Sequence, residues 1–338
     1  MNRRMSSAER RRVAARATAV ALSAVIACSS AVAAAADAAS AYPTRPIRAI
    51  VPFPAGSGTD LLARFIGAKL TERVGQQVVV DNRPGANGII AAEAAAKAGP
   101  DGHTVMFMSV SHTMNAAVYS KLPFDPVKSF TPVMMLAAGP LVLVANPSFA
   151  AGSVKTLIEL AKAKPDSITY AISGTGGINH FAGALFARTA GVRLVNVPYK
   201  GGPQALTDVI AGQVQIMIGT LSVAQAHIRT GRLKALGVST AKRTPLLPEV
   251  PTIAEAGAPG YEIAIWWGML APAGLPGPVV AKLNIEIAGI LGEPETAKRL
   301  QADAAAPAPM ASAGFLQALV SEVAKWKRVA READIRAE

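Results

Sequence analysis

Residues 47–64 read IRAIVPFPAGSGTDLLAR, and this stretch decides the fold. Its apolar start, Ile47–Val51, predicts a buried strand that the following prolines end. Ala55–Asp60 is then a turn of small residues, and apolar residues at helical spacing follow from Leu61. A helix that begins after a glycine-rich turn presents free backbone N–H groups and the positive end of its dipole. The stretch therefore predicts an α/β protein with a binding site for an anion at this turn.

Composition excludes one large class of function. The chain has 338 residues, 51% of them hydrophobic, which is enough for two domains of ordinary size. The formal net charge is +12, but the basic residues are dispersed, and aromatic side chains do not interleave with them. This pattern argues against a nucleic-acid-binding protein and fits a protein with a mild attraction for anions.

Residues 1–41 have the three-part pattern of a secretory signal peptide. An arginine-rich start is followed by the apolar run Ala17–Ala27 and by an A-x-A cleavage site at Ala36–Ala38. The apolar run is too short to span a membrane, which takes about 20 residues. We therefore expect cleavage and a periplasmic protein without cysteine, since Cys28 is the only one. Three alternatives stay open: acylation of Cys28 in a lipoprotein signal, a twin-arginine signal at Arg10–Arg12, or a cytosolic chain with an alanine-rich tail.

Strands and helices alternate twice along the rest of the chain, which predicts two α/β domains with parallel sheets. The first unit covers residues 47–108 and the second covers residues 168–218. The apolar segments Leu141–Ala145 and Ile263–Leu270 are expected to cross between the domains and to form a hinge. The predicted boundaries are residues 42–143 plus 266–338 for domain 1 and residues 144–265 for domain 2.

Two further helices are expected. Thr252 and Glu255 have the spacing of a capping box, which predicts a short helix after them. Near the C-terminus, apolar residues at helical spacing predict a helix that covers the sheet of domain 1. These residues are Phe315, Leu319, Val323, Trp326 and Ala330.

Motifs for catalysis are incomplete. Gly174–Asn179 begins like a dinucleotide fingerprint, but asparagine stands at the third glycine position. There is no phosphate-binding P-loop, and Ser57 is not in a G-x-S-x-G elbow. A triad of Ser57, His112 and Asp60 is a remote alternative, because residues of an ordinary binding loop look the same. The histidines lack metal-ligand spacing: His103, His112, His180 and His227. The sequence therefore favours binding over catalysis, with no cofactor and no metal.

The candidate site lies in loops that follow parallel strands, where open α/β sheets place their ligands. Four such loops are Gly56–Asp60, Ser109–Asn115, Ser173–His180 and Tyr199–Gly202. They are rich in glycine, hydroxyl and amide groups and poor in acids, so they can solvate a carboxylate with neutral donors. The candidate ligand-binding residues are Ala55, Gly56, Ser57, Gly58, Thr59, Asp60, Ser109, Ser111, His112, Ser173, Gly174, Thr175, Gly176, Gly177, His180, Tyr199, Lys200, Gly219, Thr220 and Trp266.

Several candidates also have a purely structural explanation. For Asp60 at a helix start we prefer the interpretation that it complements the helix dipole, and His180 can be a satisfied structural histidine. Lys200 is either a counter-charge for a carboxylate or a solvated loop lysine. Trp266 and Trp267 are adjacent on a strand, so one faces the core and the other the cleft, and the sequence does not decide which.

Seven segments together resemble the periplasmic solute-binding receptors of tripartite tricarboxylate transporters, also called Bug receptors. They occur in order and cover nearly all of residues 42–338. They read PIRAIVPFPAGSGTDLLAR, VDNRPGANG, GPDGHTVMF, YAISGTGGINHFAGALF, NVPYKGGPQALTDVIAGQV, LPEVPTIAEAGAPGYE and WWGMLAPAGLP.

The resemblance implies a two-domain Venus-flytrap fold, type II-like, of the periplasmic binding class, with two crossover strands. It implies a ligand with at least one carboxylate, held by the loops Ala55–Asp60 and Ser173–His180, and delivery to a transporter with one large and one small membrane subunit. Two departures stand out: Ser57 interrupts the family's run of small residues, and Gly219-Thr220 replaces a common Asp-Asn pair. The second departure predicts that the ligand is not an amino acid.

We expect a monomeric transport receptor. The first alternative is a receptor that presents its closed form to a membrane sensor protein. The second is a periplasmic enzyme, which would need an activated nucleophile or a metal.

Overall fold

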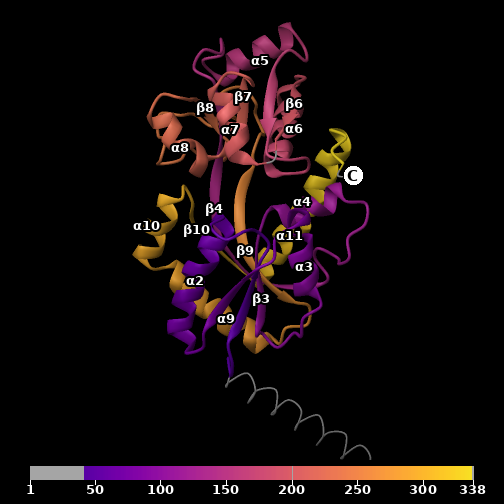
Figure 1. Cartoon of the computed structure of the whole chain (residues 1–338), viewed down its shortest axis with the longest axis vertical. Helices are drawn as coiled ribbons and strands as arrows, with labels where there is room; N and C mark the ends of the chain where they lie inside the picture. The colour runs from indigo at the N-terminus through magenta and orange to yellow at the C-terminus, as the bar shows by residue number, and fades with distance from the viewer. Residues whose placement is uncertain (1–41, 200, 337–338) are drawn as a thin grey trace, which may run out of the picture.

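The computed structural model describes residues 42–199 and 201–336, and it has two lobes joined by two long strands (Figure 1). The predicted signal peptide, Cys28 and Lys200 lie outside the described residues. None of the helices in the described ranges is both long and apolar enough to cross a membrane.

The first lobe is built on the sheet β2-β1-β3-β9-β4, with β10 also paired to β4. Its strands are β1 (Ile47–Val51), β2 (Val78–Asn82), β3 (Thr104–Ser109), β4 (Phe130–Ala145), β9 (Ala264–Pro272) and β10 (Ala306–Ala311). Its helices are α2 (Gly58–Val74), α3 (Ile89–Ala96), α4 (Ser111–Val118), α9 (Gly277–Leu291), α10 (Pro294–Ala302) and α11 (Ser312–Glu332), with a short 3₁₀ turn, η1 (Ala86–Gly88).

The second lobe continues the sheet in the order β4-β7-β5-β6, with β8 also paired to β4. Its strands are β5 (Thr169–Ile172), β6 (Val195–Pro198), β7 (Ile216–Thr220) and β8 (Lys234–Val238). Its helices are α5 (Val154–Ala163), α6 (Ile178–Ala190), α7 (Gly202–Ile210) and α8 (Leu221–Arg229).

The strand β4 passes through both lobes. Its part Phe130–Pro140 pairs with β9 in the first lobe, and its part Leu141–Ala145 pairs with β7 and β8 in the second. The partner changes between Pro140 and Leu141, so the crossing lies just before the predicted segment rather than within it. In Figure 1, β4 and β9 run side by side between the lobes.

Three parallel strands in each lobe set the position of the site. In the first lobe, β1 is parallel to β2 and β3; in the second, β5 is parallel to β6 and β7. Loops that leave the carboxyl ends of such strands gather at one edge of each sheet. The predicted order of strand and helix in both units is confirmed. The sheets are mixed and not purely parallel as predicted, because the crossing strands β4 and β9 run antiparallel to their neighbours. Six parallel strand ends are available to build a site.

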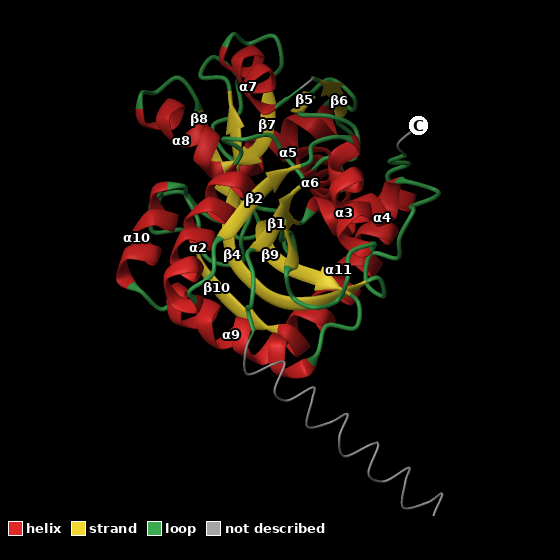
Figure 2. Cartoon of the chain, turned by 60° about the horizontal axis from the view of Figure 1, so that its bottom comes forward, coloured by secondary structure: helices red, strands yellow, loops and turns green. Residues whose placement is uncertain are grey.

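Helices cover both faces of each sheet, as the alternating pattern predicts. Figure 2 shows α2 and α9 on one side of the first lobe's sheet and α3, α4 and α11 on the other. The two sides have separate cores: Ile66 and Leu283 belong to one, and Met106 and Phe315 to the other. The second of these cores continues into the other lobe, where it includes Phe181 of α6.

The C-terminal helix α11 does more than the sequence predicts. Phe315, Leu319, Trp326 and Ala330 are buried, and Val323 is half-buried. The helix packs on α4 and β4 of the first lobe, as expected, but it also reaches α6 of the second lobe. There the Trp326 ring stands edge-on to Phe181, with 5.2 Å between ring centroids, and Arg188 pairs with Glu332 at 2.7 Å.

Other differences concern segments without a strong pattern. Thr252 and Glu255 make the reciprocal bonds of a capping box at 3.0 Å, yet the segment is a turn and not the predicted helix. Ser111–Val118 is helix α4 and not part of a loop. The sequence reading did not anticipate α8, α9, α10 or β10. The domain boundaries at residues 143 and 266 stay a prediction.

Candidate functional site

A cavity of about 460 Å³ lies between the lobes, and we call it the main cavity. Residues of the strand-end loops of both lobes and of the crossing strand β9 line it. They are Phe53, Ser57, Gly58, Thr59, Asn87, Ser109, Val110, Ser111, Ser173, Gly177, Ile178, Asn179, Gly201, Gly202, Met217, Thr220, Ser222, Val223, Ile265 and Trp267. The two lobes therefore share one cleft that is partly open to solvent, as a cleft-binding protein requires.

The first turn of α2 is closed by its own side chains. Ser57 is the N-cap, and its hydroxyl accepts a hydrogen bond from the N–H of Asp60 at 3.3 Å. The Asp60 carboxylate in turn accepts bonds from the N–H of Gly56 (2.8 Å), from Arg64 (3.0 Å) and from Asn82 (2.9 Å). Burial alone would raise the pKa of Asp60, but these bonds outweigh it and hold the pKa below its usual value. Asp60 is thus a buried, ionised part of the turn.

The first turn of α6 is held differently. Gly177 is the N-cap, and no side chain caps this helix. Ser173 donates to the side chain of Asn179, which donates to the carbonyl of Ile218 at 2.6 Å and so fixes the turn to β7. The N–H of Gly176 donates to Nδ1 of His180 at 3.2 Å. Burial lowers the pKa of His180, which keeps its ring neutral and able to accept this bond.

Each of these two turns leaves two backbone donors for a ligand. The N–H groups of Gly58 and Thr59 in α2, and of Ile178 and Asn179 in α6, make no hydrogen bond to any described residue. All four residues line the main cavity. Because the first N–H groups of a helix have no intrahelical partner, a ligand with acceptor atoms can satisfy them.

Hydroxyl and amide side chains supply the further polar groups of the lining, beside apolar side chains such as those of Phe53, Val110 and Met217. Ser109 ends β3 and Ser111 begins α4, with 3.0 Å between their hydroxyl oxygens. Asn87 comes from the loop after β2, and its amide donates to the side chain of Asn115 at 2.7 Å. Thr220 is both the last residue of β7 and the N-cap of α8. Among the described residues, no Asp, Glu, Lys or Arg lines the main cavity, so donors there are neutral.

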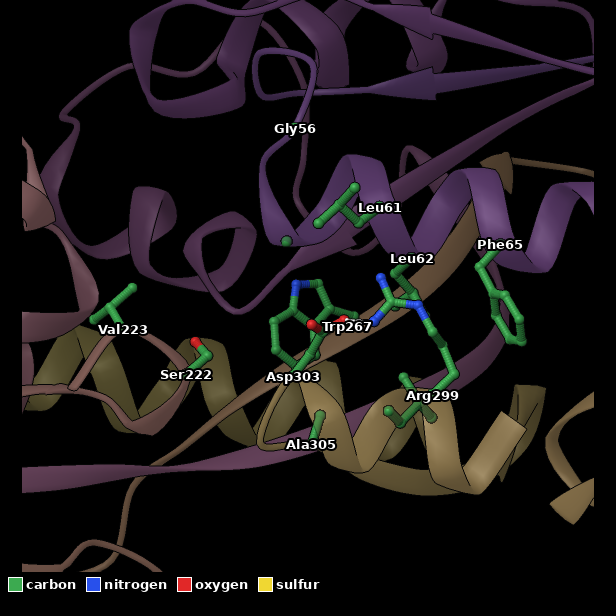
Figure 3. A pocket seen from close by; sticks show the side chains of 12 residues that line it. Gly56, Leu61, Leu62, Phe65, Ser222, Val223, Trp267, Arg299, Asp303 and Ala305 are labelled. Carbon is green, nitrogen blue, oxygen red and sulfur yellow. Dashed lines mark hydrogen bonds and ion pairs between the residues drawn. The ribbon is translucent and has the colours of Figure 1, made fainter. Parts of the chain in front are cut away.

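Trp267 separates the main cavity from a second one. Its Nε1–H donates to Thr59 Oγ1 at 3.2 Å, which ties β9 to the first turn of α2. The second cavity has a volume of about 250 Å³ and lies between α2 and α10 (Figure 3); we call it the side cavity. The two cavities share Gly58, Ser222, Val223 and Trp267.

The structure brings eight of the predicted residues to the main cavity, Gly58 among them also lining the side cavity, and one more to the side cavity alone. The eight are Ser57, Gly58, Thr59, Ser109, Ser111, Ser173, Gly177 and Thr220, and Gly56 lines the side cavity. Ten others line neither: Ala55, Asp60, His112, Gly174, Thr175, Gly176, His180, Tyr199, Gly219 and Trp266. That the nine lining residues contact a ligand stays a prediction.

Trp266 is the clearest correction. It is buried at 6% exposure against Phe315, at 5.6 Å between ring centroids, and Trp267 is the tryptophan that faces the cavities. The pairing of β9 with β3 and β4 decides which of the two adjacent side chains points to the core.

Two histidines and Asp60 have structural roles. The ring of His112 stacks on Phe124 at 5.7 Å and donates to the carbonyl of Pro126 at 2.8 Å. Burial lowers the pKa of His112 to about 4. His180 and Asp60 stabilise their own turns, so the structural interpretation holds for both.

Sequence reasoning missed lining residues from several segments, among them β9, which contributes Ile265 and Trp267. Asn87 lies in the turn-rich loop after β2, a strand end that could have been included by the same rule as the others. Ser222 and Val223 open α8 after β7, a helix that the sequence did not predict. Ile178 and Asn179 lie within the predicted loop Ser173–His180 but are not among the predicted residues. Within the described ranges no three His, Cys, Asp or Glu side chains cluster as metal ligands would.

Comparisons with known proteins assign the family. Residues 62–335 match the family described as "Tripartite tricarboxylate transporter family receptor". The chain belongs to this receptor family. The resemblance seen in the sequence is therefore confirmed.

Relatives of this receptor support the assignment. It is 40% identical over 293 residues to a UPF0065 protein from the tcbD–tcbE intergenic region of Pseudomonas sp. strain P51, covering 86% of each chain. It is 35% identical to Protein BugT of Bordetella pertussis, covering 87% of this chain and 91% of BugT.

Solved structures confirm the fold of this receptor. Rpa4515 of R. palustris, determined with adipate, matches with a TM-score of 0.77 and 38% identity, over 87% of this chain and 99% of that one. MatC of Rhodopseudomonas palustris, determined with bound malate, matches with a TM-score of 0.73 and 33% identity, over 85% and 99%. The expected α/β fold of a periplasmic binding protein is thus correct.

Proposed function

We propose that this receptor captures a small organic acid through a carboxylate held in the main cavity. One observation carries the proposal: four unpartnered backbone N–H groups, two from each lobe, line a single cavity in which the described residues supply no acidic side chain. A carboxylate has about four acceptor positions, which suits two pairs of donors. Each bond to a charged acceptor contributes on the order of 1.5–3 kcal/mol.

The relatives agree with this chemistry. The R. palustris relative determined with adipate and the one determined with malate hold dicarboxylates. We infer that this chain also takes a small organic acid, with at least one carboxylate. The resemblance leads us to expect Asp-Asn at the end of β7, where this chain has Gly219-Thr220, and Thr220 lines the main cavity. We further propose that α-amino acids are excluded, because the missing aspartate leaves their ammonium group without a carboxylate partner.

The proposed location and partner of the receptor complete this proposal. An arginine-rich start, an apolar run and an A-x-A site support export to the periplasm. The family assignment supports delivery of the ligand to a tripartite transporter, with binding but no turnover. Deletion of the transporter genes should abolish uptake of the ligand; loss of a gene-expression response without loss of uptake would instead favour the sensor alternative.

A calorimetric titration and a thermal-shift assay of the purified receptor test the binding. Mono- and dicarboxylates of two to eight carbons, the corresponding amides and a set of α-amino acids form the panel. We expect heat of binding and a raised melting temperature with carboxylates only, since a ligand that binds the folded state stabilises it by mass action. Binding of the neutral amides as tightly as the acids, or of amino acids alone, would contradict the proposal.

A further inference from the structure

The side cavity is mostly apolar and lies beside the main cavity. Figure 3 shows Leu61, Leu62 and Phe65 of α2 facing Arg299 and Ala305 from the segment around α10, with Trp267 between them. Leu300 completes the apolar lining and is buried. A cavity of about 150 Å³ lined by such side chains accommodates a benzene ring. The side cavity, at about 250 Å³, therefore has room for a ring or a chain of about six carbons.

Its charged groups neutralise each other. Arg299 and Asp303 lie one turn apart on and just after α10, and Arg299 Nη1 lies 2.8 Å from Asp303 Oδ2. The pair is half-exposed at the rim, and the rest of the lining offers the hydroxyl of Ser222 and backbone atoms of Gly56 and Gly58. A second free charge on a ligand would have to compete with the existing pair, whereas an uncharged segment would not.

The two cavities share part of their walls. Gly58 belongs to both, and a Cβ there would lie 3.7 Å from the Trp267 ring, so the glycine leaves space between helix and ring. The hydrogen bond from Trp267 to Thr59 holds that ring in place. A carboxylate at the first turn of α2 would thus sit directly beside the entrance to the side cavity.

We propose that the side cavity is a second subsite, which takes the uncharged apolar segment of the ligand whose carboxylate the main cavity holds. This inference rests on the proposed function and names the ligand class more closely. The preferred ligand is an organic acid with one carboxylate and an aliphatic or aromatic part of about six carbons. Trp267 is the wall along which that part passes.

A chain-length series on the wild-type receptor measures the subsite. The probes are acetate, butanoate, hexanoate and phenylacetate, titrated calorimetrically. Each methylene that leaves water for an apolar pocket raises affinity about fourfold. We therefore expect hexanoate to bind more than tenfold tighter than butanoate, and phenylacetate to bind at least as tightly as hexanoate.

Substitutions at Leu61 test whether the gain in affinity with chain length arises in the side cavity. Leu61 lies on the α2 surface at 38% exposure and lines only the side cavity, so its replacement is compatible with folding. Leu61→Trp fills the cavity and should reduce the ratio of hexanoate to acetate affinity at least tenfold; Leu61→Ser removes apolar contact and should reduce it about threefold. Leu160 on α5 has the same exposure and lies away from both cavities, so Leu160→Trp and Leu160→Ser are matched controls that should leave the ratio unchanged.

The outcomes separate the two proposals. If all acids bind and the ratio is the same in wild type and both Leu61 variants, the subsite is wrong and the proposed function stands. If no acid binds to a folded wild-type receptor, both are wrong. A ratio that falls in the Leu61 variants and not in the Leu160 controls supports the subsite.

Discussion

The first turns of α2 and α6 face the same cavity from opposite lobes, but they are stabilised in different ways. The turn of α2 contains its own anion, because Asp60 is buried beneath it and receives three hydrogen bonds. Ser57 caps the same helix. The turn of α6 has a glycine at the N-cap and a neutral histidine beneath it.

The difference concerns how much positive potential each turn has left for a ligand. A carboxylate at a helix N-terminus offsets part of the dipole, so the α2 turn is already partly compensated before a ligand arrives. The α6 turn has no such internal partner among the described residues. We expect the α2 turn to be the more rigid half of the site and the α6 turn to contribute more of the affinity.

Removal of single backbone donors is the strongest test of this comparison. Proline is tolerated at the first position of a helix and lacks the N–H, and the N-caps Ser57 and Gly177 both have the extended backbone that a following proline requires. Ile178→Pro should weaken binding of the preferred carboxylate roughly 10- to 150-fold, as the loss of one hydrogen bond to a charged group predicts. Gly58→Pro should weaken it less.

Two controls accompany that test. Ile178→Ala removes the side chain and keeps the donor, and Ser312→Pro places proline at the same position of α11, outside both cavities. Isothermal titration of all four variants gives the ranking. The comparison between the two turns is wrong if Gly58→Pro weakens binding as much as Ile178→Pro does.

Acid should affect the α6 turn before the α2 turn. The folded-state pKa of His180 is lowered, so the unfolded chain binds the proton first, and the stabilisation is complete above about pH 6.5 and is lost as the pH falls toward the lowered value. Asp60 also has a lowered pKa, but its stabilisation is lost only below about pH 4. The slope is at most about 1.4 kcal/mol per pH unit for one proton.

The difference in free energy of unfolding between wild type and a His180 variant isolates the contribution of His180. Urea unfolding of wild type and of His180→Asn between pH 4 and 8 should give free energies of unfolding whose difference narrows as the pH falls below about 6.5. His112, whose pKa burial lowers to about 4, contributes in the same direction but cancels in the difference. A constant difference across this pH range would show that His180 does not titrate with folding.

The N-cap of α5 provides a control for the N-cap of α2. Ser153 caps α5 through the same type of bond, to the N–H of Thr156 at 3.1 Å, and lies outside both cavities. Ser57→Ala and Ser153→Ala should each lower the free energy of unfolding by about 1 kcal/mol, measured by urea titration. Only Ser57→Ala should also weaken ligand binding, and equal effects of both variants on binding would argue against a role for Ser57 at the site.

The smallest effect is expected from giving α6 the cap that it lacks. Gly177 has φ −78° and ψ 167°, which any residue can adopt, so Gly177→Ser can place a hydroxyl on the first turn. The new Cβ would lie 3.3 Å from the carbonyl of Gly174, so we expect a gain of only a few tenths of a kcal/mol in stability. Affinity should fall, because the hydroxyl competes for a donor. Unchanged affinity in titration would mean that this donor does not serve the ligand.

Local patterns in the sequence predicted the part of the cavity lining that comes from the turns before α2 and α6. The glycine-rich stretches before α2 and α6 are contiguous, so the residues that line the cavity from them could be found directly. Asn87, Ser222 and Ile265 come from three segments far apart along the chain, and the sheet order brings them together. That order depends on long-range pairing, which a single sequence does not encode in a readable pattern.

The tryptophan pair and the side cavity also depend on long-range packing, which could not be predicted from the sequence. Period-two alternation separates Trp266 from Trp267, but only the register of β9 against β3 and β4 tells which one faces the core. The side cavity depends on α10 lying against α2, and the sequence reading did not predict α10. The fold class was predictable because it rests on repeated local patterns, whereas the shape of the site rests on packing.

The position of α11 has a consequence for biosynthesis. The last helix of the chain covers Trp266 in the first lobe and reaches Phe181 in the second. A nascent chain that ends before Ser312 has made every strand of both lobes, yet it leaves these two aromatic rings uncovered. The core is therefore complete only once residues 312–332 have been translated, and a product that stops before Ser312 leaves this apolar surface exposed.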